Sequence, residues 1–404
     1  MDHSLGVLAA SFLALACSRD SGNVPGAVQR DSSGVQIVTS DSAAYAPFVP
    51  WRLAVSATIS IGDASHIETL FPFVTDARVL GDGRIVIAEA ASNLVRFFDP
   101  SGSFEFAVGG AGGGTARFRA IGRLWVKAED SILVASNRDR RIHVITPDGR
   151  FARTISLVAP VHVLSPVAIG GLAGGAVLAW SLAARPTTPP PNGVFIDSIL
   201  LHRFDASGTF ERTLLRLPMA PVVRLRPEAG GERDVTTPLY PFPSFAAADS
   251  VVVAGTGRDS DFFVLDANSR FVRRIRWRAE PVPVIPSAHD SIVNGIALRL
   301  GVASQRLDSL LPVPERYPIY DSILVDDLGY IWVGVAVRLN ETFSYDIFSS
   351  QGRWLGRFVL PPSFQPLQIG ADFILGVRRD ADAGDRVQRF ELYRESDSAT
   401  AVGQ

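Results

Sequence analysis

Lysine, cysteine and histidine are all scarce in this chain of 404 residues. Lys127 is the single lysine, so almost all of the 39 basic residues are arginines, and 41 acidic residues bring the formal charge to −2. Contacts to phosphate dominate the affinity of nucleic-acid binders, so a nearly neutral chain is not expected to bind nucleic acid. Cys17 is the single cysteine, which excludes an intramolecular disulfide.

Local signatures of two kinds of site are also missing. The six histidines include no pair at the spacing His-x-x-x-His, which argues against a structural zinc site. The sequence contains no Gly-x-Ser-x-Gly segment, the turn that carries the nucleophile of α/β-hydrolases. No catalytic residue is therefore predicted from local motifs.

The N-terminus carries an apolar run at residues 5–16, which only Gly and Ser interrupt. This run is too short to span a membrane and is typical of the core of a signal peptide. Its end, Ala14-Leu15-Ala16-Cys17, resembles the lipobox of bacterial lipoproteins, in which the cysteine becomes the lipidated first residue. The resemblance implies lipidation at Cys17 and a membrane anchor at the cell envelope, outside the cytoplasm. The alternative is an ordinary cleaved signal with an incidental cysteine.

Residues 81–149 contain the clearest repeat of the chain. A small turn, an apolar run, a loop with one Asn, a second strand and a Pro-x-Gly turn occur twice in the same order. The two apolar runs are residues 85–88 and 132–135, and the two loop residues are Asn93 and Asn137. A repeat of this length indicates an array of blades or solenoid units.

Six such units fit the chain, and the last lacks its fourth strand. An unpartnered strand pattern at residues 51–62 precedes the first unit. Open strand edges are costly, so we expect this strand to complete the last unit. The sequence thus predicts an all-β fold, a six-bladed β-propeller closed by an N-terminal strand, over residues 51–395. It would follow a signal peptide (1–16) and a tether (17–50) with a strand-like piece at 35–38, and precede a tail (396–404).

One segment departs from the strand rhythm. Ile292, Ile296 and Leu300 recur every four residues, which predicts a helix over residues 287–301, inserted between blades four and five. In a propeller this connection lies on the same face as the loops between second and third strands. The helix would cover part of the channel mouth or present a binding surface, or it would be a packed decoration.

The first two units resemble the NHL-type repeat of six-bladed propellers. The shared features are Gly83, the run 85–88, Asn93, Phe98-Asp99, Gly102 and Phe118, and residues 326–333 carry a related signature. Propellers of this type include binding scaffolds, sensor ectodomains and enzymes. Fold alone therefore does not select a function.

Loops between the second and third strands carry the candidate ligand-binding residues. These are Asn93, Asn137, Arg138, Asp139 and Arg140. Arginine binds carboxylate and phosphate groups through two parallel hydrogen bonds, so these arginines would bind an anionic ligand. The asparagines are also suited to tight turns, since Asn tolerates a left-handed backbone. A second group of arginines is expected to lie on an outer strand, where charged side chains prevent aggregation through the open edge. These are Arg273, Arg274, Arg276 and Arg278.

A metal site is the alternative use of this face. Six-bladed lactonase-like enzymes hold a divalent metal at the channel mouth with Glu, Asn and Asp, and such oxygen ligands suit Ca²⁺. The similarity implies the weak candidates Glu89, Asn93, Asn137 and Asp259, with Asp139 on the same loops. Two functions stay open. The preferred one is a binding or protein-interaction module at the cell envelope, with a protein or small-molecule ligand at the loop face. The other is a metal-dependent hydrolase of the lactonase or esterase kind.

Overall fold

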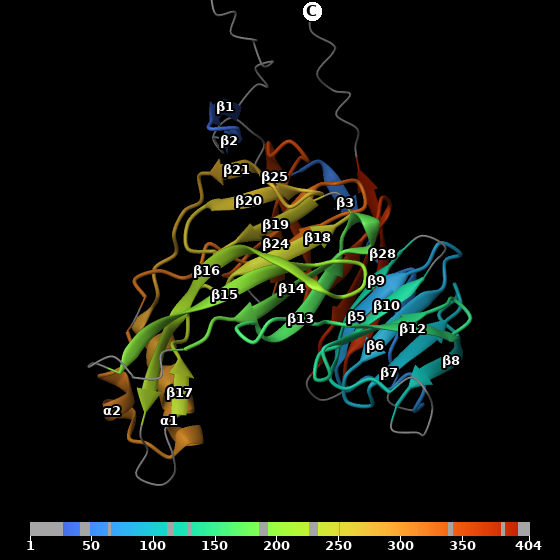
Figure 1. Cartoon of the computed structure of the whole chain (residues 1–404), viewed down its shortest axis with the longest axis horizontal. Helices are drawn as coiled ribbons and strands as arrows, with labels where there is room; N and C mark the ends of the chain where they lie inside the picture. Colours follow the sequence, from blue (N-terminus) through green and yellow to red (C-terminus); the bar gives the residue numbers. More distant parts are fainter. Residues whose placement is uncertain are drawn as a thin grey trace, which may run out of the picture.

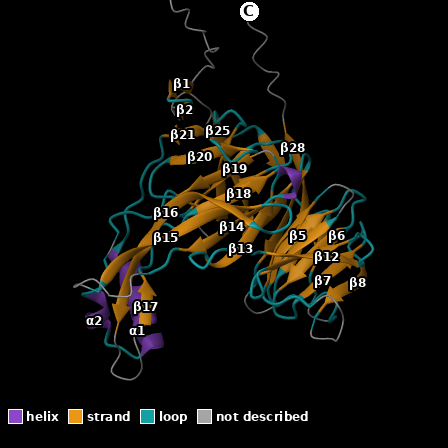
Figure 2. Cartoon of the chain, viewed as in Figure 1, coloured by secondary structure: helices purple, strands orange, loops and turns teal. Residues whose placement is uncertain are grey.

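The structure is a computed structural model that describes residues 27–40, 49–63, 66–110, 117–127, 131–185, 193–225, 233–249, 251–312, 314–337, 342–380 and 384–394. Cys17, the predicted signal peptide and the predicted tail lie outside the described residues. Nearly all regular structure is β-strand, arranged in six sheets (Figures 1 and 2). Among the described residues, no helix has the length and apolarity needed to cross a membrane.

The first two sheets have four antiparallel strands each, in chain order. The first contains β5 (Val74–Val79), β6 (Ile85–Glu89), β7 (Leu94–Phe98) and β8 (Phe104–Gly109). The second contains β9 (Ile121–Val126), β10 (Ile132–Ser136), β11 (Arg141–Ile145) and β12 (Phe151–Ser156). Every residue of β6 and β10 is buried, which explains why both read as continuous apolar runs.

The third and fourth sheets are larger. The third contains β13 (Leu164–Gly171), β14 (Val177–Leu182), β15 (Val194–Phe204), β16 (Phe210–Leu225) and β17 (Arg233–Thr236), with a 3₁₀ turn at Ala173–Gly175. The fourth contains β18 (Ser244–Ala248), β19 (Val251–Gly255), β20 (Asp261–Asp266) and β21 (Phe271–Trp277). The hairpin of β1 (Ala27–Ser32) and β2 (Val35–Ser40) extends it.

The fifth and sixth sheets complete the set. The fifth contains β22 (Tyr320–Val325), β23 (Ile331–Val335), β24 (Thr342–Phe348) and β25 (Trp354–Pro362). The sixth contains β26 (Phe364–Ile369), β27 (Phe373–Arg378) and β28 (Arg386–Arg394), joined by β3 (Trp51–Leu53) and β4 (Ile59–Ile61).

β3 and β4, which precede the first sheet in the sequence, both pair antiparallel with β28, the last strand that the structure describes. Leu53 lies opposite Leu392, and Ile61 lies opposite Val387. The Arg394 guanidinium carbon lies 4.6 Å from the centre of the Trp51 ring. The strand at residues 51–62 therefore covers the edge that the last unit would otherwise leave open, as its unpartnered pattern suggested.

A repeated aspartate shapes one turn in four of the sheets. The side-chain oxygen of Asp99 accepts hydrogen bonds from the backbone N–H groups of Ser101 and Ser103. The aspartates at positions 205, 266 and 326 accept the same pair of bonds, from the second and fourth residues after each. Aspartate stabilises such turns because its short side chain reaches backbone donors two residues ahead.

The first strands of the sheets gather at the centre. β5 contacts β9 and β26, β13 contacts β9 and β18, and β18 contacts β22. Hydrophobic clusters lie between neighbouring sheets, for example Ile85, Phe98 and Leu375 between the first and the sixth. Sheets packed face to face around a central cavity give the arrangement of a β-propeller.

Two interpretations of the sequence are wrong at the fourth sheet. The sequence predicts a tether over residues 17–50 with a short strand-like piece, but β1 and β2 form a hairpin within it, and β2 pairs parallel with β21. The arginines of β21 therefore do not guard an open edge. Arg273 bonds to Gln36 of β2, at 2.8 Å, and Arg274 forms an ion pair with Asp261.

The helical segment lies away from the centre. α1 (Pro286–Leu300) follows the predicted period, and Gly301 ends it in a left-handed conformation with φ of 66°. With α2 (Ser304–Asp308), it packs on the long β16 and on β17, at the lower left of Figure 1. Val293, Ile296 and Ala297 are buried there, and no residue of α1 lines the central cavity. The helix does not cover the channel mouth, because its apolar face is used against the third sheet.

Candidate functional site: the central cavity

The central cavity has a volume of about 930 Å³ and is lined by the first strands of all six sheets. Its size falls in the range of small-molecule pockets, which are mostly apolar with a few polar groups. Polar side chains line several parts of this cavity, among them Asn137, Asp321, Ser322 and Arg379. We call one group of them the charged wall; it consists of Arg78, Arg123, Asp327 and Gln368 on the lining, together with Asp76, the buried partner of Arg78.

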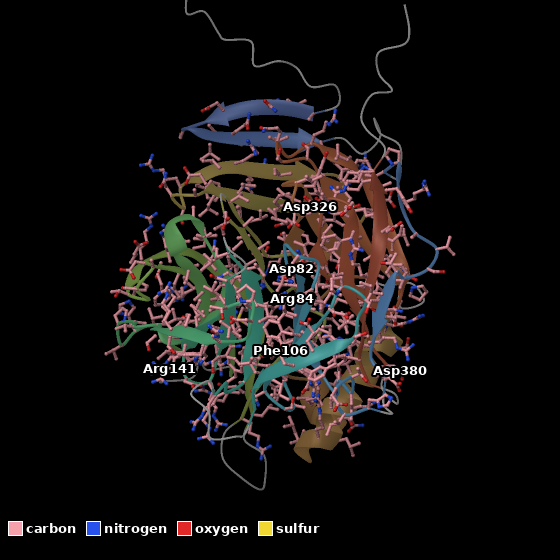
Figure 3. The ribbon with its side chains drawn as sticks, turned by 90° about the vertical axis from the view of Figure 1, so that its right-hand side faces the viewer. Asp82, Arg84, Phe106, Arg141, Asp326 and Asp380 are labelled. Atoms are coloured by element: carbon pink, nitrogen blue, oxygen red, sulfur yellow. The ribbon has the colours of Figure 1, made fainter. Side chains whose placement is uncertain are left out.

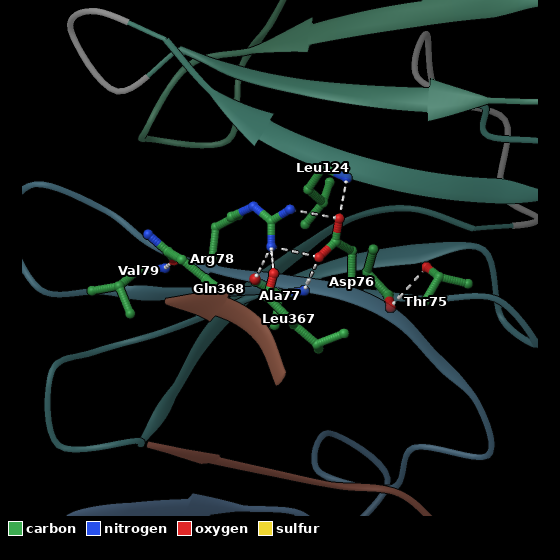
Figure 4. A network of polar contacts seen from close by, with 9 residues as sticks. Thr75, Asp76, Ala77, Arg78, Val79, Leu124, Leu367 and Gln368 are labelled. Carbon is green, nitrogen blue, oxygen red and sulfur yellow. Dashed lines mark hydrogen bonds and ion pairs between the residues drawn. The ribbon is translucent and has the colours of Figure 1, made fainter. Parts of the chain in front are cut away.

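Asp76 and Arg78 form the centre of the charged wall (Figure 4). The Asp76 side chain is fully buried, and its two oxygens lie 2.6 and 3.0 Å from Nη1 and Nη2 of Arg78. Asp76 also accepts the backbone N–H of Leu124 in the second sheet, at 2.9 Å. Arg78 donates to the Leu367 carbonyl in the sixth sheet, at 2.7 Å. This pair therefore ties three sheets together.

Gln368 and the residues beside it extend the network. The Gln368 side-chain oxygen accepts the backbone N–H of Val79, at 2.8 Å. Burial lowers the pKa of the Arg78 guanidinium, the charges of Asp76 and Asp327 raise this pKa, and the charge of Arg123 lowers it. Arg123 and Asp327 therefore lie close enough to Arg78 for their charges to act on it.

Arg123 and Asp327 differ from the Asp76–Arg78 pair in what they contact. The Arg123 side chain lines the cavity, is exposed, and makes no hydrogen bond or ion pair within the described part of the chain. Burial raises the pKa of the Asp327 carboxyl, the neighbouring Asp326 raises it further, and the charge of Arg78 opposes both. The wall thus offers a cationic donor without a partner and a carboxyl that holds its proton more tightly than usual.

Asp326 has a structural role, unlike the neighbouring Asp327. Its carboxylate is buried, accepts the indole N–H of Trp332 at 2.9 Å, and forms an ion pair with Arg394 at 2.9 Å. Figure 3 places Asp326 among the strands of the fifth sheet. All these partners are structural, so Asp326 belongs to the scaffold.

The opposite side of the cavity is formed by small side chains. We call it the small-residue wall, and its residues are Ala168, Gly171, Ala246, Ala247 and Ala248. A Cβ added to Gly171 would lie 2.5 Å from Nε1 of Trp125, so only glycine allows this approach. The Trp125 indole N–H is buried without an acceptor among the described residues.

The two ends of the cavity also differ. Phe73 and Phe242 precede the first strands of their sheets, and Phe242 lies edge-on to Trp180 with ring centres 6.4 Å apart. Lys127 and Asp249 follow the first strands at the other end and form an ion pair. Lys127 also donates to the Leu172 carbonyl, at 3.2 Å, so the single lysine joins the second, third and fourth sheets.

Two predicted site residues serve loop structure in the first sheet. Asn93 has φ of 53°, and its side-chain oxygen accepts the backbone N–H of Ile121, at 3.1 Å. Glu89 is buried, and its two oxygens accept the backbone N–H groups of Ala91 and Ser92, at 2.7 and 2.8 Å. Asn93 thus acts as the turn residue that the sequence also allowed, and it links two sheets.

The remaining predicted residues are mostly outside the cavity. Asn137 lines it, and its side-chain oxygen is buried without a partner among the described residues. Arg138 and Arg140 are exposed on the loop after β10, and Asp139 accepts a bond from Ser136 at 3.1 Å. Asp259 is exposed between β19 and β20. The described residues contain no group of three or more His, Cys, Asp or Glu side chains that could hold a metal ion.

Most of the charged wall lies on first strands, whereas most of the residues predicted from the sequence lie on loops. A usable signal existed in the first strands, where Asp76, Arg78 and Arg123 interrupt otherwise apolar segments. A charge within a buried strand is costly unless it is paired or functional. Their convergence with Asp327 depends on tertiary structure.

Small sheets around a central cavity define the chain as a β-propeller-like protein. The sequence matches no known family model and no curated protein. A member of the DUF4221 family from Bacteroides vulgatus matches over 85% of this chain and 99% of its own, with a TM-score of 0.50 and 12% identity.

Two further solved structures match with lower TM-scores. A gluconolactonase from Xanthomonas campestris matches over 85% of this chain and 100% of its own, with a TM-score of 0.42 and 11% identity. Virginiamycin B lyase from Staphylococcus aureus matches over 86% and 89%, with a TM-score of 0.39 and 12% identity. At these identities the likeness concerns the fold, and function must be argued from the site.

Proposed function

We propose that the protein is a six-bladed binding propeller that acts outside the cytoplasm and holds a small molecule in its central cavity. The observation that carries this proposal is the Arg123 guanidinium, which lines a cavity of about 930 Å³ and has no partner in the part of the chain that the structure describes. Cavities of this size with a few converging polar groups are the usual form of ligand sites.

The blade number and the location are parts of the proposal. Six sheets, and the pairing of β3 and β4 with β28, support six blades closed by the N-terminal strand. The apolar run at residues 5–16 and its end at Cys17 support export and a lipid anchor. Mass spectrometry of the mature N-terminus tests the anchor, and a Cys17 without acyl groups would contradict it.

The loop face is a second contact region in the proposal. Asn137 lines the cavity, while Arg138 and Arg140 stand exposed beside it. These arginines would contact the part of a ligand, or of a partner protein, that projects from the cavity. The resemblance of the first two units to NHL-type repeats fits a role of this kind and stays a prediction.

Fluorescence provides the experiment, because Trp125 and Trp180 line the cavity. The full-length protein is titrated with fractions of a small-molecule extract from bacterial cells, and the Trp180→Phe variant is titrated in parallel. We expect at least one fraction to change the emission and raise the melting temperature of the wild type, with a smaller emission change in the variant. Absence of any such fraction would contradict a small-molecule function.

A hydrolase is the second candidate, favoured by Asp327. A carboxyl with a raised pKa beside arginines, on the wall of a cavity, suits general acid catalysis. The metal-dependent form would need Ca²⁺ ligands that the described residues do not bring together. Hydrolysis of simple lactones and aryl esters, with and without added Ca²⁺, tests both forms, and activity that survives Asp327→Asn would exclude Asp327 as the acid.

A further inference from the structure

We infer that the ligand of the central cavity is a small anion with an apolar body, bound through its charge to Arg123 and through its body to the small-residue wall. This inference rests on the proposed function, because it names the chemical class of the ligand in the same cavity.

The first step is the charge of the wall. The Asp76 carboxylate lies 2.6 Å from Nη1 of Arg78, so these two charges offset each other. Arg123 lines the same cavity and has no such partner among the described residues, so no contact there offsets its positive charge. The other aspartates of the lining have contacts of their own, since Asp249 pairs with Lys127, Asp326 pairs with Arg394 and Asp321 accepts a bond from Ser322. An anion is the species that would pair with the guanidinium of Arg123.

The second step is which arginine contacts the ligand. Both terminal nitrogens of Arg78 already donate to Asp76, and Nη1 also donates to the Leu367 carbonyl. Arg78 is therefore a positioning residue that fixes the wall. Arg123 keeps all its donors for a ligand, and a guanidinium presents two parallel N–H groups that match a carboxylate or a phosphate.

The third step is the opposite wall. Ala168, Gly171 and the alanines of β18 expose small apolar surfaces and carry no charge. Polar groups of a ligand would lose water there without gaining a hydrogen bond, which is unfavourable. Nε1 of Trp125 is the exception, since this donor lies against Gly171 and lacks an acceptor among the described residues. The body of the ligand is thus apolar, with room for one acceptor near Trp125.

Small molecules that share a phenyl ring but differ in charge separate the contribution of the charge to binding from that of the ring. Phenyl phosphate and phenylacetate carry an anionic group on an apolar ring, and 2-phenylethanol has the same ring without the charge. Each is titrated into the full-length protein by calorimetry. We expect both anions to bind, the alcohol to bind at least about tenfold more weakly, and sodium chloride to weaken the binding of the anions.

Substitutions of Arg123 test whether this residue supplies the positive charge that binds the anions. Arg123→Gln should weaken both anions by at least about tenfold, and Arg123→Lys should restore part of the affinity. Arg153→Gln is the matched control, since Arg153 is an exposed arginine of the same sheet on the outer strand β12. It should leave the affinity within about twofold, a difference of less than about 0.5 kcal/mol. A melting temperature of Arg123→Gln close to that of the wild type establishes that the variant is folded.

Each other outcome overturns a defined part of the argument. Anions that bind equally well to Arg123→Gln would remove Arg123 from the site. Tight binding of 2-phenylethanol without binding of the anions would overturn the anionic class and leave the proposed cavity function intact. Failure of every probe to bind at millimolar concentration would overturn the inference, and the extract titration then decides separately whether the cavity binds any small molecule.

Discussion

The charged wall and the small-residue wall face each other across one cavity but are stabilised in different ways. On the charged wall, Asp76 and Arg78 join the first, second and sixth sheets through specific hydrogen bonds. Beside the small-residue wall, a Cβ added to Gly170 would lie 2.8 Å from the Cβ of Ala247, so the third and fourth sheets meet by close backbone approach. On the charged wall, Arg123 remains beside these polar links without a partner among the described residues, whereas the small-residue wall carries no charge. One ring of similar sheets can therefore provide both halves of the proposed binding site.

Removing residues 51–62 should have the largest effect, because it opens the sixth sheet, which supports the charged wall. The deletion takes Trp51, Leu53 and Ile61 out of the hydrophobic clusters and exposes the edge of β28. We expect a large drop in melting temperature or failure to fold. Deleting residues 27–32, the outermost strand β1 of the fourth sheet, is the matched control and should cost much less. Equal melting temperatures for the wild type and the 51–62 deletion would disprove closure by this strand.

Asp76→Ala should remove the ion pair at the centre of the charged wall. The change leaves the Arg78 charge without its carboxylate and the Leu124 N–H without an acceptor. We expect a loss of about 3–5 kcal/mol in the free energy of unfolding. Asp82→Ala removes a carboxylate of similar chemistry that is itself exposed and pairs with Arg84 (Figure 3), and it should cost only about 0–1 kcal/mol. Denaturant unfolding measures both variants, and similar losses would show that the wall pair is not special.

Protonation of His202 in the third sheet, behind the small-residue wall, should lower the stability of the folded protein in acid. His202 is fully buried between Ser181 and Thr213, 2.9 and 3.1 Å away, and burial lowers its pKa to about 4. The unfolded chain binds a proton near pH 6.5, which the folded chain binds only near pH 4, so stability falls as the pH falls through this window. The expected loss is about 3 kcal/mol. Unfolding between pH 7 and pH 4 should show a smaller loss for His202→Gln; the same loss in both proteins would exclude His202 as the cause.

Gly170→Val tests how closely the third and fourth sheets pack beside the small-residue wall. The added side chain must displace Ala247, so we expect a loss of about 1–3 kcal/mol. Gly295→Ala is a control of opposite sign, because a Cβ there meets nothing within 4 Å and the residue lies inside α1. It should stabilise the protein by about 0.5–1 kcal/mol. Thermal unfolding compares the two variants, and a neutral Gly170→Val would mean that the third and fourth sheets have room to separate.

Asp327→Asn should have the smallest effect, and its sign is diagnostic. A carboxyl whose pKa is raised in the folded state contributes stability below its unfolded pKa and loses that contribution as the pH rises through the folded value. Asparagine does not ionise, so the variant should be slightly more stable than the wild type at pH 7 and should lose this advantage at pH 3. A variant less stable than the wild type at pH 7 would show that the ionised carboxylate is stabilising.

Much of the fold could be predicted from local patterns. The buried runs of β6 and β10, the turns at Asp99 and Asp205, and the helix that ends at Gly301 each depend on residues close in sequence. The extension of β16 to Leu225 and its pairing with β17 were not predicted, since they depend on packing against α1. The hairpin of β1 and β2 was missed for a related reason, because its partner β21 lies far along the chain.

The sequence by itself determined the repeat, the all-β class and the unpartnered strand at residues 51–62, because strand periodicity and turn chemistry are local properties. Only the tertiary structure decided that Arg78 is paired with Asp76 while Arg123 has no partner among the described residues, and that Asp327 from a distant unit lies near them. The reason is physical: a ring of sheets brings first strands to a common centre, and the side chains that meet there are set by the closure of the ring.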